Sequence, residues 1–280
     1  MNIIKANYNG TFYPNNKTEL NAFISTQLKK IQRCKQTALL FISPHAGYQF
    51  SGKTMSYTYK NLASEKIENI IFLCISHQKN IEDIAISPPA VFELPNGNIE
   101  TNISFYEQFI CKYNELNNNN FNFHEHSLEV HLPYCIYIAE QLNKKIKIFC
   151  MQINTINIKN IENYITFINN NLLKDQKTAI IASSDLSHFP DYKTCKEKDQ
   201  KTINLLLENN IEEIIKQEKK IQENIINNLH TGICALPAVY ILIKLAQINK
   251  YRGILLDYSN SAENSGDFTR CVGYCAIMYI

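Results

Sequence analysis

Two short apolar runs decide the fold: Leu39–His45, with the sequence LLFISPH, and Ile70–His77, with the sequence IIFLCISH. A third run, Ala179–His188, reads AIIASSDLSH and ends in a similar way. Strands that are apolar throughout belong to sheets covered on both faces, and ligands bind beyond the carboxyl ends of such strands. Each run delivers an imidazole or a carboxylate at its end. The sequence therefore predicts one site assembled from three distant segments.

Strand-like and helix-like segments alternate along the rest of the chain. Examples are a predicted helix from Ser127 to Leu142, an apolar helix from Ala235 to Ile248 and a last strand from Val272 to Ile280. The polar stretch from Asp191 to Lys220 is typical of two exposed helices. This alternation indicates an α/β fold. We expect a single domain over residues 1–280: a three-layer sandwich with a largely parallel or mixed central sheet flanked by helices.

Composition excludes several classes of protein. The net charge is +2 and no basic stripe is interleaved with aromatic residues, so we expect no nucleic-acid partner. The nine cysteines form no CxxC pair, which is typical of buried thiols in a reducing cytosol. Polar residues follow Met1–Lys5 directly, and no apolar run is long enough to span a bilayer. We therefore expect a cytoplasmic protein with no signal peptide and no membrane partner.

The histidines at the ends of the first two strands are candidate metal ligands. Pro44 favours an extended residue before it, and Gly47 allows a tight turn that leaves His45 at the mouth of the strand. A lone histidine is more often a hydrogen-bonded structural residue than a ligand. With His77 at the end of a similar strand, two imidazoles in one mouth begin a metal site.

The third strand contributes Asp185 and His188, three residues apart. In a helical turn after the strand they would share a face, so that the carboxylate orients the imidazole. The alternative is a helix-capping aspartate with an incidental histidine. We favour the functional interpretation.

A second group of histidines, His124, His126 and His131, lies in the stretch HEHSLEVHLP. It is not a zinc-protease motif, because HExxH needs its two histidines four residues apart. His126 and Glu129 can face each other on a helix, whereas His131 would point away from His126. We expect this group to support or pack against the site rather than to bind a metal directly.

One cysteine stands apart from the others. Cys234 follows Gly232 at a turn that opens the apolar helix. A helix N-terminus favours the thiolate, which is the form that binds metals or attacks as a nucleophile. A cysteine in this position is more often part of the core.

Five ordered segments together resemble the Memo family, called AmmeMemoRadiSam system protein B in prokaryotes. They are GTFYP at 10–14, SPHAGYQFSG at 43–52, EHSLEVHLPY at 125–134, SSDLSH at 183–188 and VGYCA at 272–276. The resemblance runs nearly end to end. It implies a fold similar to that of class III extradiol ring-cleaving dioxygenases.

The resemblance also implies a pocket with one redox-active metal ion, iron or copper. By motif, the ligands here are His45, His77 and Cys234, and Asp185 and His188 line the pocket. The family's aromatic positions near the mouth, where a substrate would bind, are Phe12, Tyr48 and Phe50.

Two departures from the family pattern affect this site. Gln78 stands where the family has a second histidine in its GPSHH segment, and the CGxxP segment is shortened to Cys234-Ala235-Leu236-Pro237. A thiolate ligand softens the site and favours copper(I) or zinc over iron by ligand type, so zinc is a third candidate metal.

The expected function is that of a metal-binding protein with a dioxygenase-like pocket, and a redox enzyme is one possibility. In such an enzyme His188 would be the general acid–base and Asp185 its orienting partner. One alternative is a non-catalytic protein that binds a peptide or a metal in the same pocket. In either case we expect an unidentified small-molecule or peptide ligand as the partner. Another is a cysteine hydrolase that uses Cys234 with His188, for which the sequence has no oxyanion-hole motif.

Overall fold

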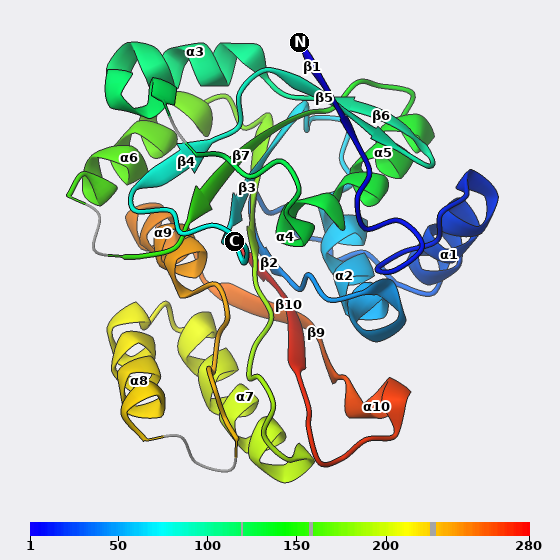
Figure 1. Cartoon of the computed structure of the whole chain (residues 1–280), viewed down its shortest axis with the longest axis vertical. Coiled ribbons are helices and arrows are strands. Elements are labelled where there is room, and N and C mark those ends of the chain that lie inside the picture. The colour runs from blue at the N-terminus through cyan, green and yellow to red at the C-terminus, as the bar shows by residue number, and fades with distance from the viewer. Residues whose placement is uncertain (119, 157–158, 225–227) are drawn as a thin grey trace.

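The centre of the molecule is a mixed seven-stranded sheet (Figure 1). The computed structural model describes residues 1–118, 120–156, 159–224 and 228–280. The strand order is β4-β7-β3-β8-β2-β10-β9, in which β7, β3, β8 and β2 are parallel. At the edges, β4 pairs antiparallel with β7, and β10 pairs antiparallel with both β2 and β9. The strands are β2 (Leu40–Ser43), β3 (Asn69–Cys74), β4 (Ile84–Ile86), β7 (Lys147–Ile153), β8 (Thr178–Ser183), β9 (Gly253–Asn260) and β10 (Gly273–Tyr279).

The central strands are apolar on both faces, which explains their unbroken runs of hydrophobic residues. In β3, Ile71 and Leu73 belong to one hydrophobic core, while Ile70, Phe72 and Cys74 belong to the other. Successive side chains of a strand point to opposite faces, so a sheet covered on both sides needs apolar residues at every position. The α/β expectation drawn from these runs is confirmed.

Helices cover both faces of the sheet and complete three layers, as predicted (Figure 1). One face carries α1 (Lys17–Lys29), α2 (Tyr48–Leu62) and α5 (Leu132–Gln141). The other carries α3 (Ile103–Lys112), α6 (Ile161–Phe167) with a following π-helical turn, α7 (Tyr192–Leu207), α8 (Ile211–Glu223) and α9 (Leu236–Ile248). Within the described residues, no helix has the length and apolar character needed to cross a bilayer.

A small second sheet lies outside the predicted elements. It pairs β1 (Asn2–Lys5) in parallel with β5 (Ala90–Leu94), which pairs antiparallel with β6 (Gly97–Glu100). These strands are short, and β1 carries polar residues, so the pattern of a buried strand is absent from the sequence. A 3₁₀ turn (Asn114–Asn118) and the short helices α4 (His126–Glu129) and α10 (Ala262–Ser265) complete the described elements.

The helix predicted from Ser127 to Leu142 is divided in two. The chain forms α4 (His126–Glu129), breaks at Val130 and His131, and starts again as α5. Pro133 lacks a backbone N–H and suits the first turn of a helix but not its interior. The break therefore sets His126 and His131 in different helical segments.

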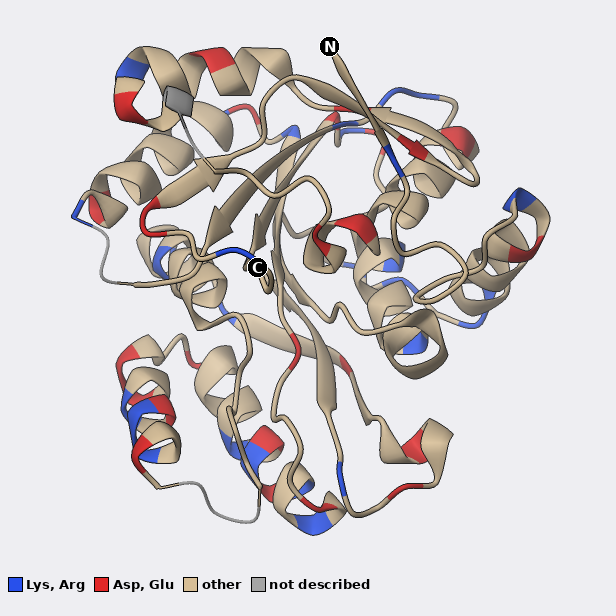
Figure 2. Cartoon of the chain, viewed as in Figure 1, with Lys and Arg blue, Asp and Glu red and all other residues tan. Residues whose placement is uncertain are grey.

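The two helices predicted between Asp191 and Lys220 are present as α7 and α8, but they are not fully exposed. Lys/Arg and Asp/Glu residues both occur along them (Figure 2). Their inner sides bury Ile203, Leu206 and Ile214 against the rest of the core. They are thus amphipathic helices that cover part of the sheet.

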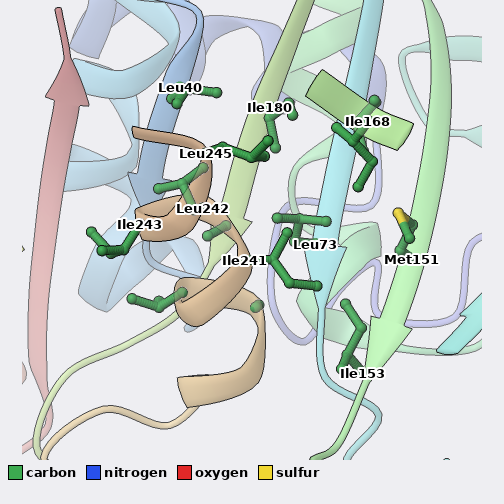
Figure 3. Close-up of a cluster of buried hydrophobic side chains, with 14 of the residues drawn as sticks. Leu40, Leu73, Met151, Ile153, Ile168, Ile180, Ile241, Leu242, Ile243 and Leu245 are labelled. Atoms are coloured by element: carbon green, nitrogen blue, oxygen red, sulfur yellow. The ribbon is translucent and has the colours of Figure 1, made fainter. Parts of the chain in front are cut away.

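The apolar helix α9 lies across the centre of its face of the sheet (Figure 3). Leu242 is fully buried within the same core as Leu40 and Leu73, whereas Ile248 at the end of the helix is 51% exposed. Leu242 and Ile248 therefore allow the loss of a buried and of an exposed apolar side chain to be compared on a single helix.

We predict that Leu242→Ala lowers the free energy of unfolding by about 2–5 kcal/mol, because it leaves a cavity in a packed core. Ile248→Ala, the matched control, should change it by less than about 0.5 kcal/mol. Urea denaturation measures both values. Equal losses in the two variants would contradict this placement of α9.

Candidate metal centre

Three neighbouring strands of the sheet deliver site residues at their carboxyl ends. β8 lies between β3 and β2, and His77, Asp185 and His45 follow these strands shortly after each ends. Asp185 and His45 are in direct contact, because the backbone N–H of His45 donates to Asp185 Oδ1 at 2.8 Å. The edge of the sheet therefore brings together side chains that are far apart in the sequence.

A cluster of three imidazoles occupies this edge. The potential ligand nitrogens of His45, His77 and His126 all lie within 4.8 Å of one another. The ring centroids of His77 and His126 are 4.2 Å apart, and that of His45 is 5.3 Å from that of His77. His45 is buried, while His126 and His77 are progressively more exposed. The cluster thus opens from the core toward solvent.

A hydrogen-bond chain through Ser183 orients the His45 ring. Its Nδ1 lies 2.9 Å from Ser183 Oγ, and the Ser183 hydroxyl donates to the carbonyl oxygen of Ser127 at 2.6 Å. Since the serine proton is used, we infer that His45 donates from Nδ1 and keeps a lone pair on Nε2. Burial lowers the pKa of His45 well below its usual range, and neighbouring His126 and His77 add to this shift. The ring is therefore neutral, as a metal ligand must be.

A buried carboxylate orients the other two rings. Glu125 Oε1 lies 2.7 Å from Nδ1 of His77 and 3.1 Å from Nδ1 of His126, and Oε2 accepts the backbone N–H of His77. Burial alone would raise the pKa of Glu125, but hydrogen bonds from His126 and His77 bring it well below its usual range. Glu125 therefore stays ionised at neutral pH. Within the described residues, no hydrogen bond occupies Nε2 of either ring.

Cys234 lies beside this cluster but is not one of its three members. Its Sγ is 3.4 Å from His45 Nε2 and accepts the backbone N–H of Asp185 at 3.1 Å. Burial and the charge of Asp185 raise the pKa of this thiol well above its usual range. This direction is opposite to the one that the sequence predicted from the helix N-terminus.

Asp185 and His188 do not share a helical turn, contrary to the sequence expectation. The chain after β8 forms no helix, and His188 forms isolated β-bridges with Thr231 and Val272. His188 Nδ1 lies 3.0 Å from the carbonyl oxygen of Leu186. Burial raises the pKa of Asp185, and neighbouring His188 opposes this shift. The two side chains are thus electrostatic neighbours placed by strand pairing rather than by helical spacing.

The three predicted aromatic positions lie in different surroundings. Phe12 packs against the ring of His126, with centroids 5.1 Å apart. Tyr48 is buried beneath, and its hydroxyl donates to the carbonyl oxygen of Val130. Phe50 is half-buried in the first turn of α2. Of these positions, Phe12 is the one in contact with the imidazole cluster.

Gln78, where the family pattern has a histidine, contacts an aromatic residue beside the imidazole cluster. Its amide donates to the hydroxyl of Tyr8 at 3.0 Å, and Tyr8 packs edge-on against both Phe12 and His126. The substitution therefore links the loop after β3 to the N-terminal segment.

His126 is the site residue that sequence reasoning missed. We expected a supporting or packing role for it, yet its ring lies within the cluster. Its expected partner Glu129 instead accepts hydrogen bonds from the backbone of Asn7 and Tyr8. His131 does pack in the core, against Phe72. The signal available in the sequence was the Glu125-His126 pair, in which an acidic residue directly precedes a histidine.

The fold and this cluster define the class of protein: a three-layer α/β protein with a cluster of histidines at the carboxyl edge of its sheet. The chain matches the family model described as Memo-like protein over residues 5–278. It therefore belongs to the Memo family, and the resemblance drawn from its motifs is confirmed.

Relatives in bacteria and archaea match almost the whole chain. A MEMO1 family protein of Aquifex aeolicus is 30% identical over 274 residues, which cover 97% of each chain. One of Nitrosopumilus maritimus is 29% identical over 282 residues, again 97% of each chain. One of Methanopyrus kandleri is 27% identical over 242 residues, which cover 85% of this chain and 82% of the relative.

We predict that Glu125→Gln weakens the dependence of stability on acid pH. The pKa of Glu125 in the folded protein lies below its ordinary value of 4.5, so its charge stabilises the fold above that pH. This contribution is lost as the pH falls through the folded value. Unfolding free energies measured by urea between pH 7 and pH 3 should fall less steeply in the variant. The exposed Glu107→Gln is the control, and identical slopes in wild type and Glu125→Gln would refute the assignment.

Proposed function

We propose that the pocket holds one metal ion, with His45, His77 and Cys234 as ligands and His126 as a further donor. The observation that carries this proposal is the cluster of three imidazoles whose donor nitrogens lie within 4.8 Å of one another. The Nδ1 atoms of all three rings are engaged by Ser183 or Glu125, which leaves each Nε2 for an ion. Metal-binding histidines are usually oriented in this way through their other nitrogen.

The spacing of the donor atoms fits an ion. Tetrahedral bonds of about 2.0 Å to nitrogen and 2.3 Å to sulfur place two such ligands about 3.5 Å apart. His45 Nε2 and Cys234 Sγ are 3.4 Å apart. A bound cation would also favour the thiolate of Cys234, against the effects of burial and of Asp185.

The donor set narrows the choice of metal. Imidazole suits iron, copper and zinc, and a thiolate favours copper(I) and zinc among them. We propose a redox-active iron or copper ion, with zinc as the competitor. When bound, such an ion supplies redox or Lewis-acid chemistry at its open coordination positions.

The surrounding side chains support a small-molecule or peptide ligand in the same pocket. Tyr8 and Phe12 form an aromatic wall against His126. Because Nδ1 of His188 faces the carbonyl oxygen of Leu186, its Nε2 is left to exchange a proton with a ligand. Asp185 holds the backbone of His45. This arrangement supports a non-haem oxidoreductase of the dioxygenase type, with His188 as general acid–base. We also propose a cytoplasmic location, for which the nine free cysteines are the support.

Anaerobic titration with Fe(II), Cu(I) and Zn(II) tests the ion. Wild type should bind one equivalent of at least one of these metals, and binding should weaken at low pH as the ligands become protonated. Cys234→Ser and His126→Gln report which donor completes the site, and His230→Gln, an exposed imidazole outside the cluster, is the control. Equal affinity and stoichiometry in wild type and Cys234→Ser would remove Cys234 from the site. No binding of any metal would refute the proposal.

Oxygen uptake by the metal-loaded protein separates an enzyme from a binding protein. With catechols as probe substrates, an enzyme should consume oxygen, and His188→Ala should slow it by about 10²–10⁴-fold because the general acid–base is lost. The metal content of this variant should stay unchanged. A protein that binds catechols or peptides without turnover would support the non-catalytic alternative.

A further inference from the structure

We propose that Asp199 of α7 and Glu218 of α8 are positioning residues that hold in place the loops that carry His188 and Cys234 at the candidate metal centre. These helices lie side by side at the end of the sheet that carries β9 and β10 (Figure 1). Neither residue belongs to the imidazole cluster. The inference rests on the proposed function for its consequence in metal binding, but the hydrogen bonds that carry it are independent of any metal.

Asp199 holds the loop of His188. Its side chain is fully buried, and Oδ1 accepts the backbone N–H of Ser187 at 3.0 Å. Oδ2 accepts the hydroxyl of Tyr258 at 2.9 Å and the thiol of Cys195 at 3.2 Å. Both carboxylate oxygens therefore accept hydrogen bonds, and one of these comes from the backbone of Ser187, the residue directly before His188.

Glu218 holds the loop of Cys234 in the same way. Oε1 accepts the backbone N–H of Gly232 at 2.9 Å, and Oε2 accepts the hydroxyl of Thr231 at 2.7 Å. The Thr231 hydroxyl also lies 3.2 Å from the backbone nitrogen of Ile233, so one carboxylate organises the turn that leads to Cys234. Glu218 is 4% exposed, which keeps water from replacing it.

Backbone hydrogen bonds connect the two loops to each other and to Asp185. The backbone N–H of His188 donates to the carbonyl oxygen of Thr231 at 3.0 Å, and that of Cys234 donates to the carbonyl oxygen of Asp185 at 3.1 Å. A displacement of either loop would therefore move both His188 and Cys234.

Two glycines show how closely the carboxylates approach the loops. A Cβ on Gly232 would lie 2.6 Å from Glu218 Oε1, and a Cβ on Gly273 would collide with the Asp199 carboxylate. Contacts this short force a shift of the neighbouring atoms. The glycines thus make room for the carboxylates at the backbone of segments beside the site.

Both carboxylates are buried, so they depend on the hydrogen bonds that the loops donate to them. Among the ion pairs found in the described part of the chain, neither Asp199 nor Glu218 has a cationic partner. Burying a carboxylate without a counterion is unfavourable unless hydrogen bonds satisfy its oxygens. What the carboxylates provide is directional hydrogen bonding to three segments of the chain.

The test measures the two loops with and without metal. In Glu218→Leu, Gly232 N–H and the Thr231 hydroxyl lose their acceptor, and Asp199→Leu removes the acceptor of Ser187 N–H. In metal-free protein, Cys234 should react about tenfold faster with iodoacetamide, followed by peptide mass spectrometry, because losing a buried hydrogen bond populates the opened loop. The NMR signals of the His188 ring, assigned with His188→Gln, should shift. In protein titrated with Zn(II) or Cu(I), affinity should fall about 10–100-fold.

Matched variants separate positioning from a general loss of stability. Leu206→Ala on α7 removes buried apolar surface and should lower the melting temperature without changing Cys234 reactivity or the His188 signals. Glu218→Gln and Asp199→Asn keep one acceptor oxygen and should restore most of the wild-type behaviour. Thr231→Val removes the hydroxyl that donates to Glu218. If a leucine variant does not fold, this variant tests the positioning role in its place.

The metal-free readouts distinguish the two proposals. If Glu218→Leu, Asp199→Leu and Thr231→Val leave Cys234 reactivity and the His188 signals as in wild type, or change them no more than Leu206→Ala does, the positioning role is refuted. If these readouts change as expected while wild type binds no metal, the positioning role stands and the proposed function fails.

Discussion

The candidate centre depends on the buried carboxylate of Glu125. Its two oxygens hold the Nδ1 atoms of His77 and His126 and the backbone of His77, so two rings from different segments are fixed relative to each other. An ionised carboxylate inside a protein is stable only when donors surround it. Here those donors are the candidate ligands, so the charge of Glu125 and the orientation of the imidazoles support one another.

Other buried acids repeat this arrangement around the imidazole cluster. Glu129 accepts the backbone N–H groups of Asn7 and Tyr8 and the hydroxyl of Tyr13, and so anchors the segment that carries Phe12. Asp185 accepts the backbone N–H of His45. Exposed ion pairs such as that of Lys17 with Glu140 are expected to contribute little to the stability of the fold. Loops without regular structure keep their shape here through carboxylate-to-backbone hydrogen bonds.

The serine at the end of β8 connects the core to the candidate site. Ser183 Oγ meets His45 Nδ1, His131 Nε2 and the carbonyl oxygen of Ser127. One hydroxyl therefore joins β8, α4 and the turn after β2. His131, which the sequence grouped with His126, takes part as a buried packing residue with its Nδ1 unpaired among the described residues. The Ser183 hydroxyl thus contacts both His45, a candidate ligand, and His131, a packing residue.

The sequence by itself determined the layers of the fold, because a strand buried on both faces must be apolar at every position. It also placed His45, His77 and Asp185 at strand ends, since parallel strands present their carboxyl ends at one edge. Only the tertiary structure decided that His126 joins them, because that contact depends on where the break before Pro133 directs α4. The geometry of Asp185 and His188 likewise depends on backbone pairing with Thr231 and Val272, segments too distant in sequence for local spacing to reveal.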